Sequence, residues 1–212
     1  MAGLLGRKIG MSQVFDPDGK VVCVTVIEAG PCIALELKPE AGTVKVAFEP
    51  VKAGKIKKPQ SGYFAKRSLD PHRYVRELPF TDQEGLEEGG VLDVSLFEAG
   101  DYVDVVGTTK GRGFAGMIKR WNASRFPMTH GHPHHRVPGS QGSSATPARV
   151  MKGKKLPGHY GNKRMTVQNL KVVEVRPEEN LILLRGAVPG PSGRLVVVKS
   201  ARKKRAAVKE KG

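Results

Sequence analysis

The sequence predicts a mainly β protein, an antiparallel barrel or sandwich with a small α+β insertion and a long irregular extension. Three observations support this class. Short runs rich in β-branched residues, separated by Gly and Pro turn signals, occupy both ends of the chain. Residues 40–90 carry charges of both signs with weak periodicity. Residues 105–173 contain 13 Lys and Arg but no Asp or Glu.

The expected strands before the basic stretch are LLGRKIGMSQVF, VVCVTVIEAG, CIALELK, TVKVAFE and two segments of VLDVSLFEAGDYVDVVG. Asp16-Pro17-Asp18-Gly19 predicts a hairpin turn between the first two. After the basic stretch, strands are expected in MTVQNLKVVEVRPEENLILLRGAV and GRLVVVKS. We assign residues 1–39, 91–120 and 162–200 to one discontinuous β-barrel.

Residues 40–90 are predicted to form the small α+β insertion, with one short helix near Ser61–Ser68. The basic tail, residues 201–212, is expected to be disordered, and its Arg202-Lys203-Lys204-Arg205 run is typical of a solvated terminus.

The positive charge is unevenly distributed. Residues 1–104 have a net charge of −3, residues 105–173 of +13, and residues 174–212 of +6, within a total of +16. The first half therefore resembles an ordinary soluble domain. The excess charge belongs to the middle stretch and the tail.

Residues 121–161 are predicted to be a long basic loop. They contain six Gly, five Pro and few large apolar side chains. Burial therefore cannot offset the entropy lost on ordering them. Phosphate contacts with a polyanion would supply the favourable free energy that burial cannot provide. Nucleic acid is favoured over anionic lipid because the stretch has no amphipathic helical stripe.

Other classes are disfavoured by the sequence. No window approaches the ~18 apolar residues of a membrane span, and no apolar run of signal-peptide length follows Met1. We therefore expect a cytoplasmic protein that does not use a membrane. Two cysteines, Cys23 and Cys32, are too few for a disulfide framework. No helix-turn-helix of a free DNA- or RNA-binding regulator is evident.

Gly111-Arg112-Gly113-Phe114-Ala115-Gly116 matches the dinucleotide-binding pattern, but no acidic residue follows until Glu174. The pattern requires one about 20 positions on for the ribose. We instead interpret the segment as a glycine turn that lets Lys110 and Arg112 approach phosphate. No cofactor or small-molecule substrate is expected.

Four histidines in six residues, from His130 to His135, raise the alternative of a metal-binding protein or hydrolase. Their spacing is not that of structural zinc ligands, and no neighbouring carboxylate could orient a ligating ring. They could instead stack on RNA bases or donate to phosphate. Because no catalytic triad or nucleophile elbow is present, we expect no metal site and no enzymatic activity.

Trp121 is the single tryptophan, and either base stacking or packing at the root of the loop would explain it. The candidate nucleic-acid-binding residues combine the cations of the stretch with its histidines and this indole. They are Lys110, Arg112, Lys119, Arg120, Trp121, Arg125, His130, His132, His134, His135, Arg136, Arg149, Lys152, Lys154, Lys155, His159, Lys163 and Arg164.

Several blocks resemble one family. LLGRKIGMSQVF, GTTKGRGFAGMIKRW, HRVPGSQG, TPARVMKGKKLPGHYGN and TVQNLKVVEVRPEENLILLRGAVPG are similar to segments of the bacterial-type L-three family of large-subunit ribosomal proteins. The resemblance covers nearly the whole chain and is weakest over residues 40–90.

This resemblance implies a translation-protein-like β-barrel whose basic extension runs through 23S-type rRNA towards the peptidyl-transferase region. It also implies binding near the 3′ end of that rRNA, an early role in subunit assembly, and neighbouring ribosomal proteins as further partners. The implied tip comprises Gly139, Ser140, Gln141, Gly142, Ser143, Ser144, Ala145 and Thr146. Some relatives carry a methylated glutamine where this chain has Ala145, so that modification is expected to be absent.

Overall fold

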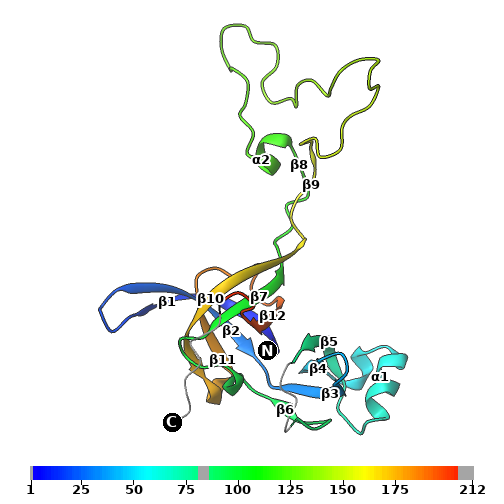
Figure 1. Ribbon diagram of the computed structural model, residues 1–212, viewed down its shortest axis with the longest axis vertical. Helices are drawn as coiled ribbons and strands as arrows, with labels where there is room; N and C mark the ends of the chain where they lie inside the picture. Colours follow the sequence, from blue (N-terminus) through cyan, green and yellow to red (C-terminus); the bar gives the residue numbers. More distant parts are fainter. Residues whose placement is uncertain (1, 81–85, 205–212) are drawn as a thin grey trace. The chain divides into compact units, whose positions relative to one another are not determined.

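The computed structural model describes residues 2–80 and 86–204. Six of its strands form a closed antiparallel barrel in the order β1-β12-β7-β10-β11-β2 (Figure 1). These strands are β1 Gly3–Phe15, β2 Val21–Ala29, β7 Tyr102–Thr108, β10 Arg164–Arg176, β11 Leu181–Arg185 and β12 Leu195–Ser200. The predicted mainly β class is confirmed.

The turn predicted between the first two strands is present. Asp16 donates its N–H to the carbonyl of Lys20 at 2.9 Å, and Gly19 donates to the carbonyl of Asp16 at 2.8 Å. Phe15 and Val21 face each other across the hairpin. Figure 1 shows the end of this hairpin projecting from the barrel, which explains why Phe15 is 75% exposed.

A second, four-stranded sheet has the order β5-β4-β3-β6. Its strands are β3 Cys32–Lys38, β4 Thr43–Pro50, β5 His72–Pro79 and β6 Val91–Leu92. The assignment of residues 32–38 and 91–92 to the barrel was wrong. The chain leaves the barrel at Gly30, where a positive φ of 88° followed by Pro31 redirects it. Because β2 and β3 both bury apolar residues, their patterns do not reveal this change of sheet.

Helix α1, Lys58–Ala65, covers the second sheet and overlaps the helix predicted near Ser61–Ser68. Pro59 occupies the first turn, where its missing N–H costs nothing. Phe64 is the buried residue of the helix and packs with Leu35 and Ala47. Three short 3₁₀ turns lie between these elements: η1 Ala53–Lys55 precedes α1, η2 Val94–Leu96 follows β6, and η3 Pro177–Glu179 connects β10 to β11.

The barrel and the second sheet share one hydrophobic core. The cluster includes Leu4, Leu5 and Ile182 from the barrel, together with Val44 and Leu78 from the second sheet. Fully burying a side chain of this size contributes about 1.5–3 kcal/mol. The shared core holds the two sheets together as one compact unit, residues 1–108 and 164–212, which we call the barrel unit.

Residues 109–163 form a second compact unit, which we call the basic unit. It contains β8 Phe114–Ala115, α2 Met117–Trp121 and β9 Gly158–His159, whereas residues 122–157 form neither helix nor strand. The basic unit begins at Thr109, before the predicted start of the loop at Trp121, because the flanking residues pair with one another rather than with barrel strands.

Both cysteines are unpaired; Cys23 is exposed and Cys32 is buried. Among the described residues, no helix has the length and apolar character needed to cross a bilayer. The last eight residues of the predicted disordered tail lie outside the described residues.

Candidate nucleic-acid interface

The basic unit has almost no interior. Within residues 109–163, all of which the structure describes, Ala115 is the only buried residue. The unit carries eleven Lys and Arg, five His and no Asp or Glu. Its cations therefore cannot form ion pairs with carboxylates of the same unit. Neither apolar burial nor charge pairing stabilises this part of the chain.

The two ends of the basic unit are held together mainly by backbone hydrogen bonds. Thr109 donates its N–H to the carbonyl of Lys163 at 3.0 Å, and Lys163 donates to the Thr109 hydroxyl at 3.2 Å. Further along, Arg112 donates to the carbonyl of Tyr160 and Tyr160 to that of Gly113, both at 2.9 Å. This ladder leaves the side chains free to face outwards.

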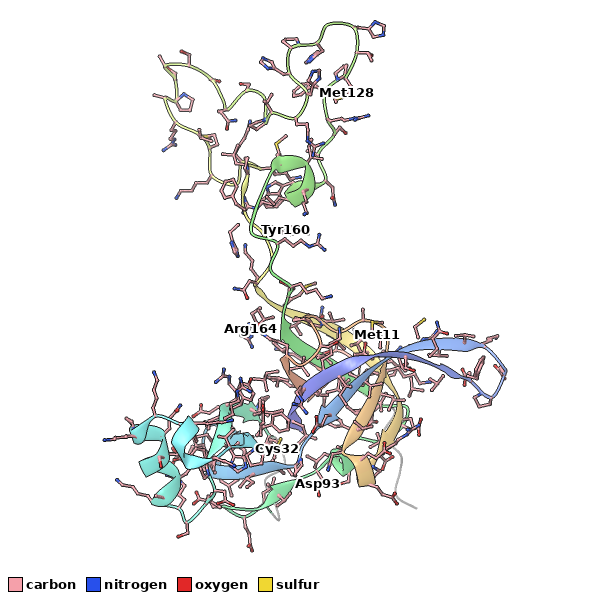
Figure 2. All side chains as sticks on the ribbon, turned by 180° about the vertical axis from the view of Figure 1, so that it is seen from behind. Met11, Cys32, Asp93, Met128, Tyr160 and Arg164 are labelled. Atoms are coloured by element: carbon pink, nitrogen blue, oxygen red, sulfur yellow. The ribbon has the colours of Figure 1, made fainter. Side chains whose placement is uncertain are left out.

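Aromatic rings and cations alternate along this ladder. The Arg112 guanidinium lies 5.1 Å from the centre of the Tyr160 ring, a cation–π geometry. Phe114, two residues later, is 80% exposed and pairs with His159 through β8 and β9. Figure 2 shows Tyr160 at this position, in a segment from which side chains point outwards. Alternating aromatic faces and cations suit nucleotide stacking and phosphate contact.

Helix α2 presents the single tryptophan. The Trp121 indole N–H donates to the carbonyl of Leu156 at 2.9 Å, and the Arg120 guanidinium donates to the same oxygen at 2.7 Å. Arg120 also lies 4.9 Å from the Trp121 ring centre. The ring remains 41% exposed. Trp121 thus packs locally through its N–H while a large part of its surface remains exposed.

The histidine cluster is engaged with backbone and an aromatic ring. The His132 ring stacks on Phe126, with centroids 5.3 Å apart and planes 16° apart. Nδ1 of His135 lies 3.1 Å from the carbonyl oxygen of Pro127, and Phe126 donates its N–H to the carbonyl of His135 at 3.1 Å. In the described part of the chain, no three His, Cys, Asp or Glu side chains gather in an arrangement that could hold a metal ion.

The implied tip, residues 139–146, is exposed throughout. Its polar side chains bond to the local backbone: Gln141 Nε2 donates to the carbonyl of Gly139 at 3.2 Å, and the Ser140 hydroxyl donates to the carbonyl of Gly142 at 3.4 Å. Met128, labelled in Figure 2, is 49% exposed on the preceding stretch. The tip is therefore an open, uncharged segment.

The structure places the predicted binding residues in the basic unit, with one exception. Arg164 is the first residue of β10 and pairs with Thr108 in the barrel unit. Phe114 and Tyr160 were not among the predicted binding residues, although each lies within two residues of a cation or histidine. Composition does not report that Phe114 is exposed and Tyr160 only half-buried, and this partial or full exposure distinguishes both rings from core aromatics.

Comparisons with known proteins agree with these features. The family described as Ribosomal protein L3 matches residues 73–180. Large ribosomal subunit protein uL3 of Desulfitobacterium hafniense (strain Y51) is 50% identical over 201 residues, covering 93% of this chain and 94% of the relative. Proteins of the same name from Brachyspira pilosicoli and Brachyspira hyodysenteriae (strain ATCC 49526 / WA1) are each 44% identical over 209 residues, covering 97% of this chain and 96% of each relative. The chain belongs to the ribosomal protein L3 family.

Proposed function

We propose that this protein is a structural constituent of the large ribosomal subunit that binds large-subunit rRNA through the basic unit and catalyses no reaction itself. The observation that carries the proposal is a unit of residues 109–163 with eleven Lys and Arg, no carboxylate and one buried residue. Its relatives from Desulfitobacterium hafniense and Brachyspira pilosicoli bear the name of a large-subunit protein.

The electrostatics of the basic unit favour RNA as its partner. Cations with no carboxylates nearby repel one another. Salt screens this repulsion only partly between charges that lie within a Debye length, about 8 Å. A phosphate backbone removes the repulsion, and the release of condensed counterions adds a favourable entropy. Exposed rings such as Phe114 and Trp121 add stacking surfaces that a simple polyanion would not use.

The geometry gives less support to a lipid surface or to metal chemistry. Helix α2 spans Met117–Trp121 and is too short to offer an apolar stripe to a bilayer. The ring nitrogens of His132 and His135 contact backbone atoms, and the His132 ring stacks on Phe126. The metal-binding or hydrolase alternative therefore rests on the sequence spacing of the histidines alone.

Salt dependence of rRNA binding tests this proposal. The affinity of the full chain for large-subunit rRNA should fall steeply with salt, with a log–log slope of about 0.7–0.9 per phosphate neutralised. The variant Lys152→Gln/Lys154→Gln/Lys155→Gln should reduce that slope by about three units. The control variant Lys52→Gln/Lys57→Gln/Lys66→Gln removes the same charge from exposed positions of the barrel unit and should leave it unchanged.

A flat salt response of the unmodified chain, or equal slopes for the two variants, would overturn the proposal. Elemental analysis of the same preparation tests the alternative, because stoichiometric, tightly held metal would favour a metal-binding protein. Sedimentation of cell lysate provides a further check: the chain should travel with large subunits rather than remain in the free fraction.

The finer parts of the proposal follow from family membership and concern assembly and the tip. We infer that the chain joins the rRNA early in assembly, near its 3′ end, and that residues 139–146 approach the peptidyl-transferase region. A photo-crosslinker on Ser143→Cys, in a Cys23→Ser background that removes the exposed native thiol, should attach to nucleotides of that region. Crosslinks confined to other rRNA segments would contradict this placement.

A further inference from the structure

A hollow of about 310 Å³ lies in the barrel unit, where strands of the barrel meet the second sheet. Its apolar lining consists of Leu78, Val106 and Val197. Its charged lining consists of Arg76, Glu77, Arg164 and Lys199. Three cations and one carboxylate thus surround an apolar floor in the barrel unit, and one of these cations, Arg164, directly follows the last residue of the basic unit.

The fold brings these cations together from three segments remote in sequence. Arg76 lies on β5 of the second sheet, Arg164 begins β10, and Lys199 lies near the end of β12. Strand β7 runs between β10 and β12, and its Val106 is opposite both Thr166 and Val197. Because the barrel and the second sheet share one core, the cations are held by ordered strands rather than by mobile loops. Figure 2 labels Arg164 at the start of β10.

The charges around the hollow are poorly compensated. In the part of the chain that the structure describes, neither Arg164 nor Lys199 forms an ion pair with a carboxylate. Burial, and then the charge of Arg164, lower the pKa of Lys199. Arg76 donates to the backbone carbonyl of Val75 at 2.8 Å.

The one carboxylate of the lining is already engaged. Glu77 forms a 2.5 Å ion pair with Lys38, so its charge is shared with a cation outside the hollow. Like charges held together on rigid strands, with little compensation, are unfavourable in the free protein, and an anion seated between them would relieve their repulsion.

We propose that this hollow binds a backbone phosphate of the large-subunit rRNA through Arg76, Arg164 and Lys199, as a second anchor distinct from the basic unit. The proposal rests on the proposed function. Two guanidinium forks match the geometry of phosphate oxygens, and an ammonium adds a compact point charge. Because the site is formed by folded strands, it costs less ordering entropy on binding than the coil of residues 122–157.

The test compares two variants of the full chain with equal charge loss. Arg76→Gln/Arg164→Gln/Lys199→Gln removes the cations of the hollow, whereas Lys52→Gln/Lys57→Gln/Lys66→Gln removes exposed cations of the second-sheet region. The hollow variant should reduce the log–log salt slope of rRNA binding by about two to three units and the affinity at moderate salt by about 10- to 100-fold. The control variant should bind like the unmodified chain.

Amine labelling of the unmodified chain gives a readout that does not depend on variant folding. Bound rRNA should protect Lys199 from acylation several-fold, while Lys52 stays equally reactive with and without RNA. Steep salt-dependent binding by the unmodified chain, combined with an unchanged slope for the hollow variant or an unprotected Lys199, would overturn this inference and leave the proposed function standing. If the unmodified chain itself showed no salt-dependent binding to rRNA, that result would instead contradict the proposed function.

Discussion

Gly161 packs its backbone directly against the carbonyl oxygen of Lys110, in the space that a β-carbon would need. Gly161 also has a φ of 76°, a left-handed conformation that favours glycine. The contact lies between the hydrogen-bonded pairs Thr109/Lys163 and Arg112/Tyr160. Glycine at this position therefore lets the two ends of the basic unit run close enough to pair.

Replacing this glycine should open the ladder. In Gly161→Ala, the left-handed conformation costs about 1–2 kcal/mol, and the β-carbon must displace backbone. Amide exchange at Arg112 and Tyr160, measured by NMR, should accelerate about tenfold or more, since 1.4 kcal/mol corresponds to a factor of ten. Gly153→Ala is the matched control, because Gly153 has a φ of 81° but no atom near its missing β-carbon. Equal protection in both variants would show that the close approach does not matter.

Much of the fold could be predicted because strands and turns are local. The short runs that became β1 and β2 and the turn at Asp16–Gly19 required no knowledge of distant residues. The membership of β3 could not be predicted, because Gly30 and Pro31 mark a change of direction without stating which sheet follows. Local pattern specifies an element, whereas its partner strand depends on global packing.

Part of the candidate site could likewise be predicted from the sequence, and part of it could not. Composition located the basic stretch, since the absence of carboxylates over residues 105–173 is visible in the sequence. The pairing of Phe114 with His159 is a backbone contact between short strands and has no sequence period. The meeting of Arg76 with Lys199 depends on two sheets sharing a core, so no sequence spacing could reveal it.

The hydroxyl of Tyr63 should stabilise the contact between α1 and the second sheet. It donates to the Glu36 carboxylate at 2.6 Å, and this bond is the main cause that lowers the pKa of Glu36. Lys45 and Arg67 also contact that carboxylate. Tyr63→Phe should cost about 0.5–1.5 kcal/mol of unfolding free energy at neutral pH and move the pKa of Glu36 upwards, as measured by NMR titration and urea unfolding.

The sign of the pH effect follows from the lowered pKa. A carboxylate with a lowered pKa contributes stability that is present above its ordinary pKa and lost as pH falls through its folded value. The difference between Tyr63→Phe and the unmodified chain should therefore shrink as pH falls below the ordinary pKa of a glutamate and through the lowered pKa of Glu36. Tyr74→Phe is the control, because among the described residues its hydroxyl makes no hydrogen bond. A pH-independent difference would assign the effect of Tyr63 to packing.

The two thiols should differ sharply in reactivity. Cys32 is fully buried beside the carbonyl of Leu5, to which its S–H donates at 3.4 Å, and burial raises its pKa to about 12. Because the thiolate is the reactive form, iodoacetamide should label exposed Cys23 in the folded chain and Cys32 only after unfolding. Mass spectrometry of peptides labelled with and without urea provides the measurement.

The same burial predicts an alkaline loss of stability. A raised pKa means that the protonated Cys32 thiol contributes stability that is fully present below the unfolded value, near 8.5, and lost as pH rises towards 12. The unfolding free energy of the unmodified chain should therefore fall faster above about pH 9 than that of Cys32→Ala. Parallel pH profiles, or labelling of both thiols at equal rates, would contradict the burial of Cys32.

Phe114 should contribute to RNA affinity without contributing to the stability of the free chain. Its ring is 80% exposed in a unit that contains no carboxylate, so Phe114→Ala should change the unfolding free energy by no more than about 0.5 kcal/mol. Stacking of one base on an aromatic ring is worth about 1–3 kcal/mol. Binding to large-subunit rRNA, measured by filter retention at fixed salt, should weaken by about 5- to 150-fold.

Phe15→Ala is the matched control for this measurement. Phe15 is similarly exposed, at 75%, but lies beside Asp16 and near Asp18, whose charges oppose a phosphate backbone. Its removal should leave rRNA affinity unchanged. An equal loss in both variants would show that affinity follows general exposure of aromatic rings. A loss confined to Phe114 would show that an exposed ring contributes to affinity where it lies among uncompensated cations such as Arg112.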